Sequence, residues 1–191
     1  MEPTDSRTML AKPQAVSEAR VKEDAMLDVL RAAALLAAAM TMGIVTGVFQ
    51  LYAYAIMPGL RRTDDRTFVG AFQQIDRAII NAWFMFSFFG ASVFTGLASV
   101  LQLDEGAGSV LPWTAAAFVL YLAVVVITIA ISVPLNDSIK AAGEPAQIAD
   151  LAAVRKRFDE VKWVRWNLVR AIVCTFAFGC LLWALVEYGR L

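Results

Sequence analysis

The sequence predicts an all-α integral membrane protein, a four-helix bundle whose helices run up, down, up and down. Hydrophobic residues make up 59% of the 191-residue chain and charged residues only 18%, whereas soluble domains carry about 25% charged residues. Four stretches are long and apolar enough to cross a bilayer, which takes about 20 residues. Each span must be helical, because lipid offers no partner for open backbone hydrogen-bonding groups.

Stretches free of charged residues locate the spans. With the last stretch extended past the single charge of Arg170, they predict spans at residues 32–57, 78–102, 111–133 and 168–187. Residues 1–28 are expected to form a polar, largely disordered tail. Residues 29–191 then form the four-helix membrane domain.

The second and fourth helices are expected to be long and to extend beyond the membrane. Asp64 or Asp65 can cap a helix that runs straight into the second span. The third span is predicted to end at Pro134, because a residue before proline disfavours the helical region. From Gln147 onward, one stripe of apolar residues recurs at helical spacing and predicts one rod that continues into the fourth span. The stripe consists of Leu151, Val154, Phe158, Val161 and Leu168. The charge run at 155–162 is interpreted as a solvated face.

Charge and composition exclude several classes of function. Basic and acidic residues number 17 each, which argues against a nucleic-acid binder, since such proteins carry an excess of basic surface. The chain has no histidine, which removes a Ser-His-Asp triad and most catalytic zinc sites. Cys174 and Cys180 lie on different sides of one predicted helix and are expected to be unpaired. We expect no metal site and no cofactor.

Basic residues are concentrated in two connections, 61–77 and 137–167. The positive-inside rule places these connections in the cytoplasm and both termini outside. The expected location is a bacterial cytoplasmic membrane, with the lipid bilayer as the first partner. The sequence leaves open whether the chain acts alone or as a homo-oligomer.

Polar residues occur at one end of every predicted span. Because the helices alternate in direction, the end of span one, the start of span two, the end of span three and the start of span four lie at the same membrane face. Polar groups near a membrane are frequently functional. The residues expected to converge there are Tyr54, Pro58, Arg61, Asn81, Asn136, Trp166, Asn167 and Arg170.

Each of these residues also has a structural interpretation. Arg170 can extend its head group to the membrane interface, and Trp166 can belong to an interfacial aromatic belt. Asn136 can be a turn residue. A shared pocket is favoured because four helices show the pattern at one end.

Such a pocket would combine hydrogen-bond donors with apolar walls, to which Phe84 would contribute. This chemistry suits a planar apolar ligand bearing oxygens whose negative charge grows in a transition state. The nearby carboxylates are Asp76, Asp137 and Asp159, and the sequence does not select a base among them.

Four motifs, in the order MPGL, N-x-W, P-L-N and R-W-N-x-x-R, resemble those of the anthrone oxygenase family, over residues 32–189. The resemblance implies a cofactor-independent oxygenase. It would use O2 to oxidise an anthrone-like or other planar aromatic substrate to a quinone. An anthrone has an acidic CH2 group whose enolate reacts with O2 directly, so the protein need only remove a proton and stabilise the anion.

The resemblance also implies roles for particular residues. Arg170 and Asn167 would stabilise the anion, and Asn81 and Asn136 would position the substrate oxygens. Asp137 is the candidate base. The implied substrate contacts are Trp166 stacking on the rings, Arg61 closing the mouth, and Tyr54, Gln50 and Phe84.

A non-catalytic membrane module is the competing hypothesis. In it, the polar end fixes helix register or contacts another protein. The small-residue motif GIVTG, residues 43–47, favours close helix packing and so supports this alternative.

Overall fold

A computed structural model describes residues 6–103 and 108–190, and its described part is helical with connecting turns and no strand. The predicted all-α class is confirmed. By length and composition, four helices are the spans of an integral membrane protein: Ser17–Leu60, Ala82–Val100, Leu111–Lys140 and Leu151–Tyr188.

The first half of the chain forms one antiparallel pair of spans. Span one begins within α1 (Ser6–Leu51) and continues through the π-helical turn η1 (Tyr52–Ile56) and α2 (Met57–Leu60). The amphipathic helix α3 (Asp65–Ile79) follows and leads to α4 (Ala82–Val100), which is span two. Helix α4 packs along α1.

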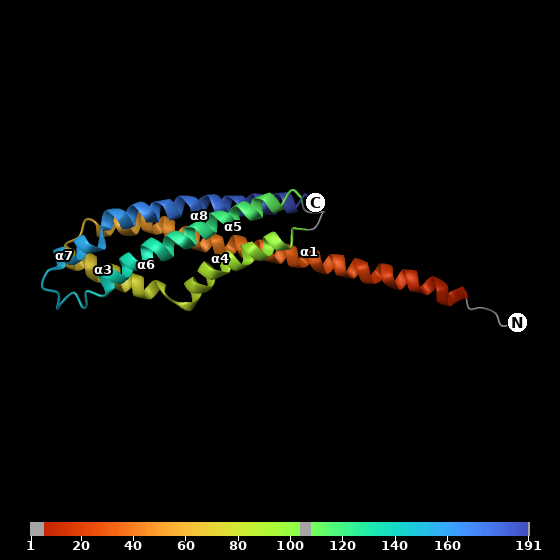
Figure 1. Ribbon diagram of the computed structural model, residues 1–191, viewed down its shortest axis with the longest axis horizontal. Helices are drawn as coiled ribbons and strands as arrows, with labels where there is room; N and C mark the ends of the chain where they lie inside the picture. Colours follow the sequence, from red (N-terminus) through yellow and green to blue (C-terminus); the bar gives the residue numbers. More distant parts are fainter. Residues whose placement is uncertain (1–5, 104–107, 191) are drawn as a thin grey trace.

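The second half repeats this order of elements. Span three comprises α5 (Leu111–Ile127), the π-helical turn η3 (Thr128–Ser132) and α6 (Val133–Lys140). A short helix, α7 (Leu151–Phe158), then precedes α8 (Glu160–Tyr188), which is span four and packs along α5. In Figure 1 α3, α6 and α7 gather at one end of the bundle, and α1 leaves the bundle at the other end.

Both π-helical turns precede a proline. Met57 N–H bonds to Tyr52 O ahead of Pro58, and Val133 N–H bonds to Thr128 O ahead of Pro134. Proline lacks an N–H and its ring crowds the carbonyl four residues earlier, and a wider turn relieves this conflict. The prediction that the third helix ends at Pro134 is therefore wrong, because it continues to Lys140.

The second helix is also not continuous. Its predicted start is confirmed, since Asp64 Oδ1 accepts a hydrogen bond from Thr67 N–H at 3.0 Å. Hydrogen bonds from Thr67 hold the pKa of Asp64 below its ordinary value. The helix ends at Ile79, and Asn81 then caps α4 by accepting from Phe84 N–H at 3.0 Å. An asparagine cap starts a helix in a new direction, so α3 does not run straight into the span.

The expected fourth rod breaks at Asp159. Its backbone is left-handed, with φ of 52°, and its side chain caps α8. The break resets the helical phase, so Phe158 is buried whereas Val161, expected on the same stripe, is exposed.

The charge run is not wholly solvated either. Arg155 bonds to Asp65 Oδ1 at 3.0 Å and to Glu160 Oε2 at 2.9 Å, and its guanidinium lies 4.1 Å from the centre of the Phe68 ring. It also donates to the carbonyls of Thr63 and Arg61. Arg155 thus fastens α7 to the α2–α3 connection.

The tail differs from the predicted disordered segment at 1–28, because α1 is helical from Ser6. The segment that leads into the span is rich in Ala, Glu, Lys and Arg, which are strong helix formers. Tyr188 donates to Asp28 O at 2.7 Å and Arg31 donates to Leu101 O at 2.9 Å. These bonds attach the helix to the bundle before the predicted span begins at residue 32.

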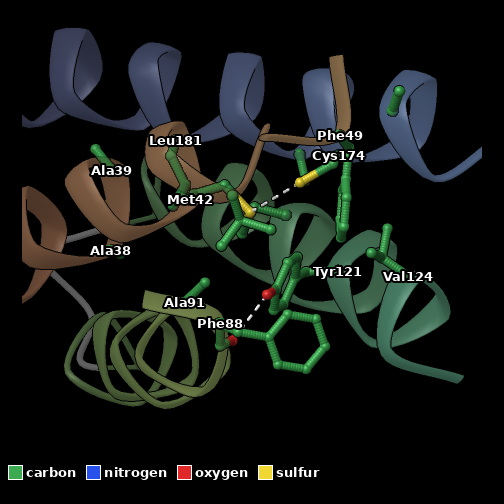
Figure 2. Close-up of a cluster of buried hydrophobic side chains, with 14 residues drawn as sticks. Ala38, Ala39, Met42, Phe49, Phe88, Ala91, Tyr121, Val124, Cys174 and Leu181 are labelled. Carbon is green, nitrogen blue, oxygen red and sulfur yellow. Dashed lines mark hydrogen bonds between the residues drawn. The ribbon is translucent and has the colours of Figure 1, made fainter. Parts of the chain in front are cut away.

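Small side chains let the four spans approach closely in the core (Figure 2). Buried alanines of α1, α4, α5 and α8 surround a few larger residues, among them Met42 and Tyr121. The Tyr121 hydroxyl donates to Phe88 O at 2.7 Å, and Cys174 Sγ lies 3.7 Å from Met42 Sδ. Cys174 and Cys180 are both free thiols.

Candidate functional site

A cavity of about 290 Å³ lies at the end of the bundle where α3 and α6 approach the spans. Span one and α8 supply its back wall, the end of α3 with α4 supplies one side, and η3 with α6 supplies the other. Its volume is near the lower end of the range for small-molecule pockets, about 300–1,000 Å³. The polar side chains that line it are Tyr52, Asp76, Thr128, Ser132, Asn136, Asp137, Lys140, Trp163, Asn167 and Arg170.

Arg170 is the buried cation of this cavity, with 5% of its surface exposed. Its Nη1 donates to Thr128 Oγ1 at 3.1 Å and its Nη2 to Asn167 Oδ1 at 3.0 Å. The guanidinium lies 4.5 Å from the centre of the Phe49 ring, a cation–π distance. Its Nε has no hydrogen-bond partner among the described residues. Arg170 is thus held in place by two of the five N–H donors of its guanidinium.

Asn167 connects Arg170 to span one. Its Nδ2 donates to Phe49 O at 3.2 Å, a carbonyl just before η1. The amide therefore orients the guanidinium with its oxygen and holds α8 against span one with its nitrogen.

A second polar chain crosses the cavity from α8 to α3. Trp163 Nε1 donates to Asn136 Oδ1 at 2.7 Å, and Asn136 Nδ2 donates to Asp76 Oδ1 at 2.6 Å. Lys140 Nζ lies 2.8 Å from Asp76 Oδ2 and 3.1 Å from Asp137 Oδ1. The Asp76 side chain is 8% exposed and that of Asp137 is 63% exposed, so the ion-paired chain leads from the cavity to the surface.

Tyr52 carries a hydroxyl that forms no hydrogen bond within the part of the chain that is described. The residue is 7% exposed and lines the cavity. Its ring packs on Trp163 at a centroid distance of 5.5 Å. The Tyr52 hydroxyl could therefore donate a hydrogen bond to a molecule bound in the cavity.

Five of the ten site residues predicted from sequence line the cavity. They are Phe84, Asn136, Asp137, Asn167 and Arg170.

The other five lie outside the cavity lining. Asn81 caps α4 and donates to Ala78 O at 2.8 Å. Gln50 donates to Thr175 Oγ1 at 2.9 Å, on the side of span one that faces α8. Tyr54 is 68% exposed, Arg61 is an exposed side chain 3.9 Å from Glu160, and Trp166 is half-buried on α8.

Sequence reasoning missed Tyr52 and Lys140, and it chose Trp166 where Trp163 lines the cavity. It chose Tyr54 because regular spacing from Gly47 and Gln50 placed that tyrosine on their stripe. The π-helical turn at Tyr52–Ile56 changes that spacing. A proline six residues after Tyr52 was the available signal, and Pro134 stands six residues after Thr128 in the same way.

Within residues 6–103 and 108–190, no three Cys, Asp or Glu side chains are grouped as ligands of a metal ion would be. The donors around the cavity are instead guanidinium, ammonium, amide, indole and phenol groups, which suit an oxygen-bearing organic ligand.

A family model described as anthrone oxygenase matches residues 83–180. The match runs from the first turn of α4 into α8 and contains Asn136, Asn167 and Arg170, whereas Tyr52 and Asp76 precede it. No curated protein and no solved structure matches the chain. Because the family model covers more than half of the 191 residues, the chain belongs to the anthrone oxygenase family.

Proposed function

We propose that the cavity is the active site of a cofactor-independent oxygenase that converts an anthrone-like aromatic substrate and O2 to a quinone and water. The observation that carries the proposal is the pairing of a buried carboxylate with buried donors around one apolar cavity. Asp76 stands at one side, and Arg170 and Tyr52 stand at the back. This arrangement can remove a proton and stabilise the resulting anion.

The reaction balances without another oxidant. A base removes one proton from the CH2 group of the anthrone, and the enolate gives one electron to O2, producing superoxide and a carbon radical. These combine to form a C–O bond and, after protonation, a hydroperoxide. Loss of the second CH2 proton with cleavage of the O–O bond gives the carbonyl and releases water. One oxygen atom enters the product and the other leaves as water.

Asp76 is the proposed base, in place of Asp137. Lys140 and Asn136 both contact the Asp76 carboxylate, which fixes its orientation. Asp137 is largely exposed, and its carboxylate lies 3.1 Å from Lys140 Nζ. Because Asp76 is buried and lines the apolar cavity, its carboxylate is the one placed to meet a substrate proton.

Arg170 and Tyr52 are the proposed stabilisers of the substrate oxygen. Both residues line the cavity, so the Tyr52 hydroxyl can donate to a substrate oxygen and the Arg170 guanidinium can place its positive charge beside that oxygen. A donor held in place before the reaction stabilises developing charge more than one that must reorient. Phe84, Phe88 and Phe49 would cover the rings.

Oxygen uptake with emodin anthrone tests the proposal. The purified protein should consume one O2 per anthrone and form the quinone well above the spontaneous rate. Asp76→Asn should lower the turnover rate about 10²–10⁴-fold, the usual contribution of a general base. Asp137→Asn should lose much less, and Glu144→Gln, an ion-paired carboxylate outside the cavity, should retain the wild-type rate.

Wild-type protein that is folded but no faster than spontaneous oxidation would overturn the proposal for this substrate. Equal losses in Asp76→Asn and Glu144→Gln would remove Asp76 from the role of base.

The alternative of a non-catalytic membrane module is favoured by one observation. Asn136 and Asn167 are hydrogen-bonded within the chain on both sides of their amides, as expected of residues that fix helix register. If the module interpretation holds, Asp76→Asn will lower stability without any catalytic rate to lose.

We further propose that connections 61–77 and 137–167 face the cytoplasm of a bacterial cell. These segments hold most of the basic residues near the spans, which is typical of the cytoplasmic side. Labelling of Arg62→Cys by a membrane-impermeant maleimide only after cells are opened would support this orientation, and labelling in intact cells would reverse it.

A further inference from the structure

The cavity has a polarity gradient from back to mouth. Arg170, Asn167 and Asp76 are each at most 5% exposed and stand deep in it. Ile80, Phe89 and Ile129 also line it but are 58%, 59% and 64% exposed. Lining residues that are themselves exposed mark where a cavity opens. The opening therefore lies between the α3–α4 side and the η3 side.

Helix packing accounts for an opening at this place. Helix α4 packs along α5 but makes no extensive contact with η3 or α6. The connection between α3 and α4 also lies away from α5 and α6 (Figure 1). The break capped by Asn81 thus leaves a gap in the side wall of the bundle, and the cavity lining confirms that side chains do not fill it.

Much of the opening lies between helices that are long and apolar enough to cross a membrane. Phe89 lies about two helical turns into α4, and Ile129 lies within the third span. Both belong to helices long and apolar enough to cross a membrane. Only Asp137 and Lys140, at the other end of the opening, supply charge to the rim.

The end of the bundle next to α3, α6 and α7 is closed by a second apolar cluster. Phe72 packs against Phe158 at a centroid distance of 4.5 Å and edge-on to Trp163 at 5.5 Å. Ile139 and Phe68 are completely buried in the same cluster. A ligand arriving along the bundle axis would have to displace these side chains, whereas one arriving from the side would not.

We infer that the cavity takes its ligand sideways from the bilayer, through the opening between Phe89 and Ile129, and that the ligand class is a lipid-dissolved aromatic ring system that can carry a hydrocarbon tail. The oxygen-bearing ring reaches Arg170 and Asp76, while the tail stays among the lipid chains. The inference rests on the proposed function only in treating the cavity as a site for planar rings.

The helices supply a matched pair of positions for the test. Phe86 and Phe89 are both phenylalanines on α4, at 60% and 59% exposure, but only Phe89 lines the cavity. Each is replaced by cysteine in a Cys180→Ala background, where the remaining Cys174 is completely buried. Benzyl methanethiosulfonate then adds a bulky apolar group, which dithiothreitol removes.

Binding is measured in phosphatidylcholine nanodiscs with two probes, methylanthraquinone and hexadecylanthraquinone. The readout is the quenching of tryptophan fluorescence by the bound probe. The quenching that remains in Trp163→Phe is subtracted, because Trp163 lines the cavity. Both probes should bind the unlabelled protein. The label should slow association of the probes at least tenfold in Phe89→Cys. The original association rate should return once dithiothreitol has removed the label and has itself been washed out. The same label in Phe86→Cys should change neither rate nor affinity.

Several outcomes would overturn lateral entry. These are binding of the short probe with exclusion of the long one, an equal effect of the label at both positions, no effect at Phe89→Cys, and no Trp163-dependent quenching by either probe. Oxygen uptake separates this result from the proposed function. If the label does not change the rate of anthrone oxidation, the proposed oxygenase function holds and lateral entry is rejected. If the label slows binding but the protein oxidises no anthrone, lateral entry holds and the oxygenase function is rejected.

Discussion

Asp76 of α3 and Trp163 of α8 are joined by a single side chain, that of Asn136. The Asn136 amide donates to Asp76 at 2.6 Å and accepts from Trp163 at 2.7 Å. Three helices thus meet through one group that must be both donor and acceptor. Asparagine meets this need and aspartate does not.

Asn136→Asp should therefore disrupt this contact. The new carboxylate would still accept from Trp163, but would place a second acceptor and a second negative charge against Asp76. We expect a loss of about 1–3 kcal/mol in the free energy of unfolding, measured by thermal denaturation in detergent. Asp150→Asn is the control, since Asp150 caps α7 by accepting from Ala153 N–H and asparagine caps a helix as well as aspartate does. Equal losses in both variants would contradict the special role of Asn136.

Arg170→Lys tests the planar geometry of the guanidinium. Lysine keeps the charge but cannot reach Thr128 and Asn167 at once or stack on Phe49 as arginine does. If Arg170 stabilises the oxyanion, the rate of anthrone oxidation should fall about 10²-fold, while circular dichroism shows a folded protein. Arg165→Lys, at an exposed position of α8, should match wild type. An active Arg170→Lys variant would make the residue structural.

Arg155 should be the most sensitive residue of its charge run. Arg155→Ala removes two ion pairs and two bonds to carbonyls, and leaves the partly buried Glu160 without its closest partner. The expected loss of stability is about 1–3 kcal/mol. Arg157→Ala, two residues along and exposed, should change stability by no more than about 0.5 kcal/mol. Similar melting temperatures for the two variants would argue against the fastening role of Arg155.

Two glycines should respond in opposite ways to alanine. A Cβ at Gly90 would lie 3.3 Å from Thr41 of α1 and 3.2 Å from Phe94, closer than ordinary packing, so Gly90→Ala should destabilise the α1–α4 contact. A Cβ at Gly47 would meet nothing within 4 Å. Gly47→Ala should stabilise the helix by about 0.5–1 kcal/mol through higher helix propensity. Thermal denaturation of both variants tests this, and a destabilised Gly47→Ala would contradict it.

The sequence predicted which polar residues share one end of the bundle. Asn136, Asn167 and Arg170 belong to three different segments, yet they line one cavity. Helix number and alternating direction were enough for this inference, because both follow from where the apolar stretches lie. Asn81 illustrates its limit, since it lies at the expected end but serves as a helix cap.

Tyr52 and Asp76 illustrate what the sequence pattern could not decide. Which tyrosine faces the cavity depends on the extra residue in the turn before Pro58. The burial of Asp76 depends on the fold of α3 against α6, which brings Lys140 and Asn136 to its carboxylate.

The sequence by itself determined the number of spans, their helical state and the end at which polar groups gather. These properties are sums over about 20 residues, so single-residue features do not disturb them. Only the tertiary structure decided which side chains enter the cavity and where the cavity opens. Each residue turns a helix by about 100°, so one π-helical turn or one break, as at Tyr52–Ile56 and Asn81, changes the face that every later side chain presents.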